Sequence, residues 1–379
     1  MLSSIGRRVF QKAASNHAVC AQHVTPSIIF RTFSDVPQPG FTSVSISEAQ
    51  STTALALKKI GWDDDDANVQ AEIMTAAEVC GNNQGLVKMY QPALMAPSPN
   101  ASKPTVERDT ASSAVVNANQ SPGMVAAVMA ADLAVSKVTD DDSKSKPTIA
   151  IVSAYNTSTS SGQLGHYVER MAKRGVIGIA LANSPEFVSA APGGDPVFGT
   201  NPLAVGIPRG SNVAPFTFDM ATSAIALFGV LTAKSKGEPL PEHVAYRKDG
   251  SMTTDASEVM EGGAIATFGG HKGAGLSLVV ELLAGALSGG AVLGEVESKK
   301  AAKSWGHTMI AINPNMLVDD FERKSASVID AVRASGDSIR IPGERSAKIA
   351  AERMKKGTLP IPEKIWESIV NTAENGLPK

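Results

Sequence analysis

The chain has 379 residues, of which 43% are hydrophobic and 19% are charged, which is enough for a large buried core and predicts more than one lobe. Its formal net charge of -2 at pH 7 argues against nucleic acid or an anionic membrane as partner, because both favour a strongly basic surface. No uninterrupted apolar run approaches the roughly 20 residues that a membrane-spanning helix needs.

Residues 1–34 differ from the rest of the chain. They contain basic residues and several serines, and the first acidic residue is Asp35. Read as a helix, their start has one apolar and one basic face, as a mitochondrial transit peptide does. A disordered basic tail and a plastid signal are the alternatives. We expect residues 1–34 to be removed in the mitochondrial matrix, a reducing compartment that suits the single remaining thiol, Cys80.

Two helices are predicted between residues 45 and 80, because apolar residues recur at helical spacing on both sides of Gly61. The four aspartates at 63–66 lie where the second helix begins. Carboxylates at that position cap a helix and complement its positive end, so a helix start is favoured over a metal site. Gly81 is a suitable residue to end the helix.

Helices and strands alternate in the rest of the chain. Residues 96–119 are rich in Pro, Ser and Asn and predict a surface connection, and residues 139–146 predict an exposed loop. The remaining patterns predict an α/β (α+β mixed) fold. Its strands are expected at 148–153, 177–182, 203–207, 216–218 and 309–312, and its helices at 124–137, 164–174, 223–234, 274–288, 346–356 and 362–374.

A glycine-rich segment, Gly-Gly-His-Lys-Gly-Ala-Gly at 269–275, precedes an apolar helix. A phosphate fits such a helix N-terminus, where free N–H groups favour an anion and Lys272 adds a positive charge. The spacing matches neither a P-loop nor a GxGxxG motif, and a tight turn into a packed helix explains the glycines equally well. Asp219 and Thr222, after a predicted strand, likewise either face a ligand or cap the next helix.

Six motifs, taken in chain order, resemble the malate/L-lactate dehydrogenase family over residues 46–357. This family is distinct from the Rossmann-type lactate and malate dehydrogenases. The motifs are GIALANS at 178–184, GTNP at 199–202, DMATS at 219–223, TTD at 253–255, GGHKG at 269–273 and IPGE at 341–344. The resemblance implies a homodimer that uses NAD or NADP to interconvert small 2-oxo and 2-hydroxy acids. Some members reduce cyclic imino acids instead.

The resemblance also implies a division of the chain. After the transit peptide (1–34), residues 35–146 form the largely helical part of a substrate and dimerisation lobe. Residues 147–315 form a non-Rossmann, mixed-sheet NAD(P)-binding lobe, and residues 316–379 return to the first lobe as helices. The cofactor contacts carried over from the family are Ser184, Thr200, Asn201, Phe218, Asp219, Met220, Thr222, His271, Lys272, Gly273, Gly343 and Glu344.

The catalytic positions depart from the family's pattern. The family's Asp-Ser-His-Gly-Val-x-Arg segment appears here as NNQGLVK at 82–88, so Asn83 replaces Ser, Gln84 replaces His and Lys88 replaces Arg. Ser160 stands where the family's principal acid/base histidine is expected. Neither Gln84 nor Ser160 titrates near neutral pH, which predicts slow chemistry. Lys88 still attracts a carboxylate, but without the bidentate fork of arginine.

Other histidines offer limited replacement. His166, on a predicted helix six residues after Ser160, is the best reserve base, although a partly buried structural histidine is the alternative. His271 belongs to the cofactor motif, and His307 lies just before a predicted strand as a structural hydrogen-bonding residue. His243 lies in a polar loop. No metal site is expected.

Two hypotheses therefore stand. The first is a mitochondrial NAD(P)-dependent oxidoreductase that acts on a small 2-oxo or 2-hydroxy acid. The second is a pseudoenzyme that keeps the fold and serves as a structural or regulatory subunit of a larger mitochondrial assembly.

Overall fold

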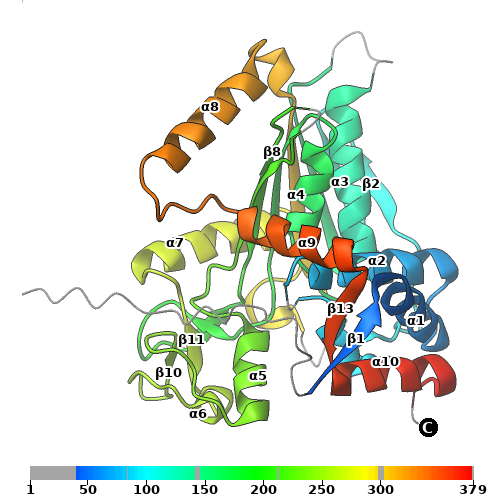
Figure 1. Ribbon diagram of the computed structural model, residues 1–379, viewed down its shortest axis with the longest axis vertical. Coiled ribbons are helices and arrows are strands. Elements are labelled where there is room, and N and C mark those ends of the chain that lie inside the picture. The colour runs from blue at the N-terminus through cyan, green and yellow to red at the C-terminus, as the bar shows by residue number, and fades with distance from the viewer. Residues whose placement is uncertain (1–39, 83, 141–145, 211–212, 298–302, 378–379) are drawn as a thin grey trace, which may run out of the picture. The chain divides into compact units, whose positions relative to one another are not determined.

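The computed structural model of the protein describes residues 40–82, 84–140, 146–210, 213–297 and 303–377. The first and last elements of this part lie together (Figure 1). Strand β1 (Phe41–Ser45) pairs antiparallel with β13 (Thr358–Pro362). Helix α1 (Ile46–Lys59) packs against both α2 (Asp64–Val79) and α10 (Glu363–Asn375).

The two N-terminal helices begin where the sequence predicts. The Ser45 hydroxyl accepts a hydrogen bond from the Glu48 N–H over 3.1 Å, and Asp63 Oδ1 accepts one from the Asp66 N–H over 3.0 Å. Lys103 Nζ bonds Asp63 and Asp66, at 2.9 and 2.6 Å, so the acidic run is a helix cap with a lysine partner.

A seven-stranded mixed sheet forms the centre of the fold. Its strand order is β2-β3-β4-β12-β5-β8-β9, and only the β3–β4 pair is parallel. This topology differs from the all-parallel sheet of a Rossmann unit. The strands are β2 (Thr105–Asp109), β3 (Ser113–Asn117), β4 (Ile149–Thr157), β5 (Ile177–Ala182), β8 (Leu203–Ile207), β9 (Phe216–Met220) and β12 (Trp305–Ile312).

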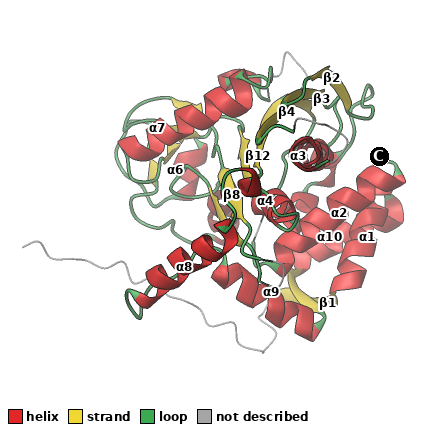
Figure 2. Ribbon diagram, turned by 90° about the horizontal axis from the view of Figure 1, so that it is seen from above, coloured by secondary structure: helices red, strands yellow, loops and turns green. Residues whose placement is uncertain are grey.

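Helices cover both faces of this sheet (Figure 2). Helices α3 (Gly123–Thr139) and α4 (Gly165–Ala172) pack on one face, where Met309 of β12 joins the main core. Ile310, the next residue, packs with Val280 and Ala284 on the other face, as the alternation of side chains along a strand requires. That face carries α7 (His271–Val280) and the π-helix η3 (Glu281–Ala286).

A smaller sheet, of order β10-β11-β6-β7, has its own hydrophobic cluster. Its strands are β6 (Val188–Ser189), β7 (Pro196–Phe198), β10 (Ala245–Tyr246) and β11 (Ala264–Ala266). Its helices are α5 (Leu227–Lys236) and α6 (Ala256–Met260).

The C-terminal part adds α8 (Phe321–Ala334) and α9 (Glu344–Lys356), neither of which has a buried residue. Short helical turns complete the chain at η1 (Leu86–Tyr90), η2 (Pro92–Met95), η4 (Leu293–Glu295) and η5 (Pro314–Met316). No helix in the described ranges is both long and apolar enough to cross a membrane.

The elements confirm most of the sequence-based prediction, with four corrections. The helix expected over 223–234 begins at Leu227 and has no side-chain cap, so Thr222 does not cap it. Residues 96–119 are not only a surface connection, because β2 and β3 lie within them, and β2 is exposed along its whole length, so it carries no apolar alternation. The helix expected over 274–288 changes to π geometry at Glu281. The last strand of the sheet begins at Trp305, which places His307 inside it. The proposed division into lobes stays a prediction.

Candidate active site

Lys88 and Ser160 are hydrogen-bonded in the structure although 72 residues separate them. The Lys88 Nζ donates to the Ser160 Oγ over 2.7 Å. Lys88 belongs to η1, and Ser160 belongs to the loop between β4 and α4. The Nζ also lies 5.2 Å from the centroid of the Phe228 ring, at the start of α5. Two of the predicted catalytic positions are therefore in direct contact.

The Lys88 ammonium is buried without a carboxylate partner among the described residues. Lys88 is 8% exposed, and burial lowers the pKa of its ammonium to about 8, because it removes water that stabilises the charge. The cation–π contact with the Phe228 ring offsets only part of the cost of burying the charge. A site with a buried and unpaired cation is suited to an anionic ligand.

Ser160 lies beside the N-terminus of α3. The Thr159 hydroxyl accepts a hydrogen bond from the Gly123 N–H, over 3.2 Å. A Cβ at Gly123 would collide with the carbonyl oxygen of Thr159, so glycine permits this close approach. Helix α3 has no side-chain cap of its own. Its positive end adds to the charge of Lys88 and favours an anion beside Ser160.

Gln84 borders the same loop. A Cβ at Gly85 would collide with the Met74 carbonyl oxygen, so this segment is held closely against α2. The main-chain oxygen of Gln84 lies 3.8 Å from the position of a Cβ at Gly162. Asn83 lies outside the described residues. The three predicted catalytic positions that are described thus belong to adjoining segments.

Glu78 supports η1, and the sequence reasoning did not identify it. Its carboxyl group is held by the Leu86 N–H and lies near the Arg353 guanidinium. Burial raises the pKa of Glu78 to about 7, although both partners act in the opposite direction. No sequence pattern distinguishes Glu78 from the other charged residues of its helix, so its role could not be predicted.

His166 is not in contact with the Lys88–Ser160 pair. It is half-buried on α4, and burial lowers the pKa of its imidazole. The charged groups that act on it are Glu72, Arg170, Glu169 and Lys173. In the described part of the chain, no contact with Lys88 or Ser160 supports His166 as a base.

His307 differs from its expected role. It was expected to form structural hydrogen bonds before a strand, but it lies within β12, is completely buried, and has no partner for either ring nitrogen among the described residues. Burial lowers its pKa to about 4. The strand begins two residues before His307, so strand pairing fixes the surroundings of the ring.

The glycine-rich segment opens α7 without a side-chain cap. Gly269 and Gly270 have φ of +57° and +61°, and a Cβ at Gly273 would collide with the Phe268 carbonyl oxygen. His271 and Lys272 are exposed in the first turn. The first N–H groups of a helix have no partner within it, so this end can receive a phosphate.

A hydroxyl and amide network joins α7 to two loops of the large sheet. The Thr200 N–H donates to the Ser184 hydroxyl over 2.9 Å, and the Thr222 N–H donates to the Thr200 carbonyl over 2.9 Å. The Ser277 hydroxyl of α7 then donates to Thr222 Oγ1 over 2.7 Å. Thr222 and Asn201 are completely buried, so their side chains hold the loops together, whereas Ser184 and Thr200 are only half-buried.

A buried carboxylate, Glu281, anchors this network and was missed in the sequence. Its oxygens accept hydrogen bonds from Asn183 Nδ2 (3.1 Å), Asn201 Nδ2 (2.8 Å) and the Leu293 N–H (3.0 Å). Glu281 is 4% exposed and begins the π-helix. The available signal was a single acidic residue inside the apolar run 276–287.

The remaining cofactor positions lie at β9. Asp219 lies between Phe218 and Met220, and its Oδ2 accepts a hydrogen bond from the Gly165 N–H over 2.8 Å, at the first residue of α4. The residue as a whole is exposed, but burial of its carboxyl group raises the pKa to about 6, against the lowering effect of the Gly165 hydrogen bond. Asp219 therefore caps α4 from a neighbouring strand.

The turn before α9 also meets β9. A Cβ at Gly343, which has a φ of +86°, would come within 2.7 Å of the Thr217 carbonyl oxygen. Glu344 forms an ion pair with Arg333, and this partner lowers the pKa of its carboxyl group. Gly343 and β9 are thus in close contact, while the Glu344 carboxylate is paired with Arg333 of α8.

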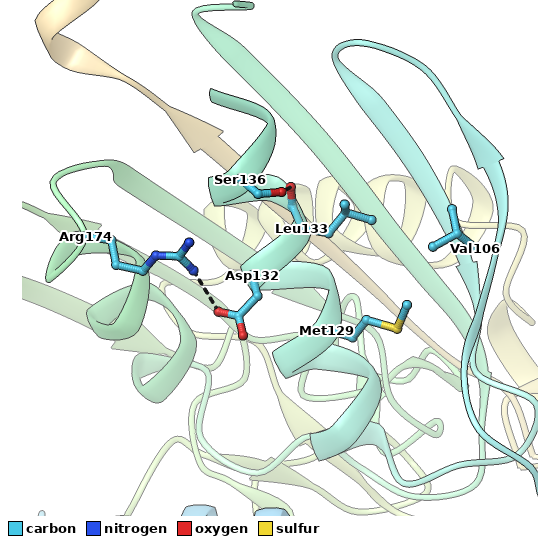
Figure 3. Close-up of a pocket in the computed structure, with 6 residues that line it drawn as sticks. All are labelled: Val106, Met129, Asp132, Leu133, Ser136 and Arg174. Carbon is cyan, nitrogen blue, oxygen red and sulfur yellow. Dashed lines mark hydrogen bonds and ion pairs between the residues drawn. The ribbon is translucent and has the colours of Figure 1, made fainter. Parts of the chain in front are cut away.

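One surface hollow of about 550 Å³ lies apart from these residues. The Asp132 carboxylate in it is paired with Arg174 (3.1 Å) and also with Arg170. The hollow contains none of the predicted site residues (Figure 3), and its lining consists of Val106, Met129, Asp132, Leu133, Ser136 and Arg174. No metal-binding cluster of His, Cys, Asp or Glu occurs in the described ranges.

A family model described as malate/L-lactate dehydrogenase matches residues 44–370. The chain belongs to the malate/L-lactate dehydrogenase family. An L-sulfolactate dehydrogenase from Methanothermobacter thermautotrophicus is 36% identical over 275 residues, which are 71% of this chain and 77% of that protein.

Solved structures of the malate/L-lactate dehydrogenase family share the fold. A malate dehydrogenase from Entamoeba histolytica aligns with a TM-score of 0.79 and 26% identity, over 89% of this chain and 99% of that chain. A delta1-piperideine-2-carboxylate reductase from Pseudomonas syringae pvar. tomato aligns with a TM-score of 0.77 and 28% identity, over 87% and 99%. The mixed α/β fold class is thereby confirmed.

Members of the malate/L-lactate dehydrogenase family are NAD(P)-dependent dehydrogenases and reductases of small acids. The placement of Lys88 at the family's arginine position and of Ser160 at its histidine position stays a prediction from the sequence motifs. In the structure the side chains of these two residues are hydrogen-bonded.

Proposed function

We propose that this chain is a mitochondrial NAD(P)-dependent oxidoreductase that interconverts a small 2-oxo acid and the corresponding 2-hydroxy acid. The observation that carries the proposal is the Lys88–Ser160 pair, a buried ammonium 2.7 Å from a hydroxyl, at two positions that the sequence motifs predict to be catalytic.

The geometry suits the shared part of such substrates. In a 2-oxo acid the carboxylate and the oxo oxygen lie on neighbouring carbons. Lys88 and the N-terminus of α3 attract the carboxylate, while the Ser160 hydroxyl meets the neighbouring oxygen. Cyclic imino acids place a nitrogen where that oxygen lies, so they are the second substrate class to screen.

The α7 segment fits a dinucleotide phosphate. Its N-terminus has no side-chain cap, Lys272 is exposed beside it, and the Glu281 network fixes the loops that adjoin it. When bound, the dinucleotide supplies or accepts a hydride at the substrate carbon. The residues of this chain orient the acid and handle the proton at its oxygen.

The proposed location rests on residues 1–34, which lie outside the described part of the chain. Their basic and amphipathic composition supports import into the matrix. A fluorescent fusion of the full chain should co-localise with mitochondria, and deletion of residues 1–34 should abolish this. Retention of the deleted form in mitochondria would contradict the assignment.

A homodimer is part of the proposal. Helix α8 has no buried residue, yet Val328 and Val332 are 63% and 46% exposed. An apolar stripe of this kind is typical of a surface covered by a partner. Sedimentation equilibrium should give twice the chain mass, and V328E should shift it towards the monomer. A monomeric wild type would contradict this part.

A second candidate is a structural or regulatory subunit of a mitochondrial assembly. The observation in its favour is that neither Gln84 nor Ser160 is an acid or base near neutral pH. This reading predicts a stoichiometric partner on purification from mitochondria and no turnover by the isolated chain.

The deciding experiment is an absorbance assay of NADH and NADPH oxidation with 2-oxo acids and cyclic imino acids. We expect turnover with at least one 2-oxo acid and one of the dinucleotides. Turnover should be lost in K88M, which lacks the ammonium. Wild-type protein that binds a dinucleotide but turns over no acid in either direction would overturn the oxidoreductase proposal and favour the subunit.

A further inference from the structure

The family's acid/base histidine has no direct replacement here, but the reaction still needs a proton at the substrate oxygen. Positioned proton transfer is typically worth about a hundredfold to ten-thousandfold in rate. The Ser160 hydroxyl alone is too weak an acid and base near neutral pH to provide it. A titrating group must therefore act through or beside it.

The structure places such a group on the inner side of Ser160. Lys88 Nζ donates to Ser160 Oγ over 2.7 Å, and Lys88 is the only partner of that oxygen among the described residues. Lys88 is buried while Ser160 is half-buried. We infer from this difference that the hydroxyl is the part of the pair that a substrate reaches, because its own hydrogen is not used by Lys88.

We propose that Lys88 is the acid and base of the reaction and exchanges its proton with the substrate oxygen through the Ser160 hydroxyl. This inference rests on the proposed function. It assigns Ser160 as the residue that contacts substrate and Lys88 as the source of the proton.

The proton steps balance in both directions. During reduction, the substrate carbon takes a hydride from the dinucleotide and its oxygen takes the Ser160 hydroxyl proton. Lys88 passes one ammonium proton to Ser160 Oγ, becomes a neutral amine and regains a proton from water. During oxidation, the substrate carbon would lose a hydride to the oxidised dinucleotide, and its hydroxyl proton would pass to Ser160 Oγ. Ser160 would pass its own proton to the neutral Lys88 amine, and the resulting ammonium would release a proton to water.

Two neighbouring substitutions together make this relay possible. Arginine in place of Lys88 would remain charged at any ordinary pH, whereas a lysine can lose its proton when it is buried. In the described part of the chain no charged group shifts the pKa of the Lys88 ammonium, and burial alone lowers it to about 8. Both protonation states are thus accessible near neutral pH. The chain has exchanged a titrating histidine for a titrating lysine.

The variants K88R and S160A separate the relay from simple binding. K88R keeps the positive charge, so KM should change by only a few-fold while kcat falls by about a hundredfold or more. S160A should lower kcat to a similar degree. K173R is the matched control, because Lys173 is 64% exposed and pairs with Glu169 on the surface, and it should match wild type.

The pH dependence gives a second readout. For wild type, kcat/KM for oxidation should rise with pH through an apparent pKa near that of Lys88, since the amine must be neutral. K88R should lose this step. Independently of activity, nuclear magnetic resonance of lysine labelled at the ε-carbon should detect one titration absent from K88R, well below that of the other lysines, in the protein without dinucleotide.

The outcomes distinguish the two proposals. If wild type has turnover but folded K88R keeps both its rate and its pH step, the relay is wrong and the oxidoreductase stands. If the lysine resonance titrates with the ordinary surface lysines, the relay is also wrong. If wild type has no turnover with any acid, both proposals fail.

Discussion

Glu281 accepts a hydrogen bond from Asn201 over 2.8 Å, and this contact ties the π-helix to the loop before β8. The carboxylate also accepts bonds from Asn183 and from the Leu293 N–H. One buried acid thus fixes three segments around the proposed dinucleotide site.

E281A should destabilise the protein by at least about 2 kcal/mol, because the two buried donors on Asn183 and Asn201 lose their acceptor at about 1–3 kcal/mol each and the partly buried Leu293 N–H loses its acceptor as well. Urea denaturation measures this change. E374A is the control, since Glu374 is exposed on α10, and it should differ from wild type by less than about 0.5 kcal/mol. Equal midpoints for E281A and E374A would contradict the anchoring role.

G270A and G273A should each weaken NADH or NADPH binding by about tenfold or more, equivalent to about 1.4 kcal/mol. Gly270 has a φ of +61°, where alanine is strained, and a Cβ at Gly273 meets the Phe268 carbonyl oxygen. Titration calorimetry is the measurement. A Cβ at Gly275 meets nothing within 4 Å, so G275A should bind normally. Equal loss in all three variants would argue against a phosphate site.

The contribution of His307 to stability should depend on pH. Its pKa is lowered to about 4 from an ordinary value near 6.5. Its contribution is therefore fully present above about pH 6.5 and is lost as the pH falls towards 4, by roughly 3 kcal/mol in total. In H307L the free energy of unfolding should fall less steeply between those pH values, because up to one fewer proton is taken up on unfolding. H243Q, at an exposed histidine, should not. An unchanged slope in H307L would contradict this.

The contribution of Glu78 to stability should change with pH in the opposite direction to that of His307. Burial raises the pKa of Glu78 to about 7, so its contribution to stability is present below about pH 4.5 and is lost as the pH rises through 7. The neutral amide keeps an acceptor for the Leu86 N–H. E78Q should match wild type near pH 4.5 and exceed it at pH 8 by about 1–3 kcal/mol, measured by chemical denaturation. A variant less stable than wild type at pH 8 would contradict the assigned cause.

The sequence predicted those features that depend on local pattern. The helices on either side of Gly61 were correct because helical spacing and the Asp63 cap act within one turn. The strand at 203–207 was also correct, since its apolar residues are continuous. The edge strand β2 was missed because it buries nothing and therefore shows no alternation.

The candidate site depended on the fold. The substitutions at Lys88 and Ser160 were visible separately, and Lys88 was interpreted only as a weaker carboxylate ligand. Their contact required η1 and the loop after β4 to meet across 72 residues. The burial that lowers the pKa of Lys88 also depends on how these segments pack. The orphaned ring of His307 could not be predicted because its strand begins earlier than the apolar run.

The most direct test of the account is a crystal structure of the full chain with NADH or NADPH and oxamate, an analogue of a 2-oxo acid that resists reduction. We predict that the oxamate carbonyl oxygen lies within hydrogen-bonding distance of Ser160 Oγ. Its carboxylate should lie beside the N-terminus of α3, with the dinucleotide phosphates at the N-terminus of α7. Oxamate bound elsewhere, or a Lys88–Ser160 pair closed off from both ligands, would contradict the account.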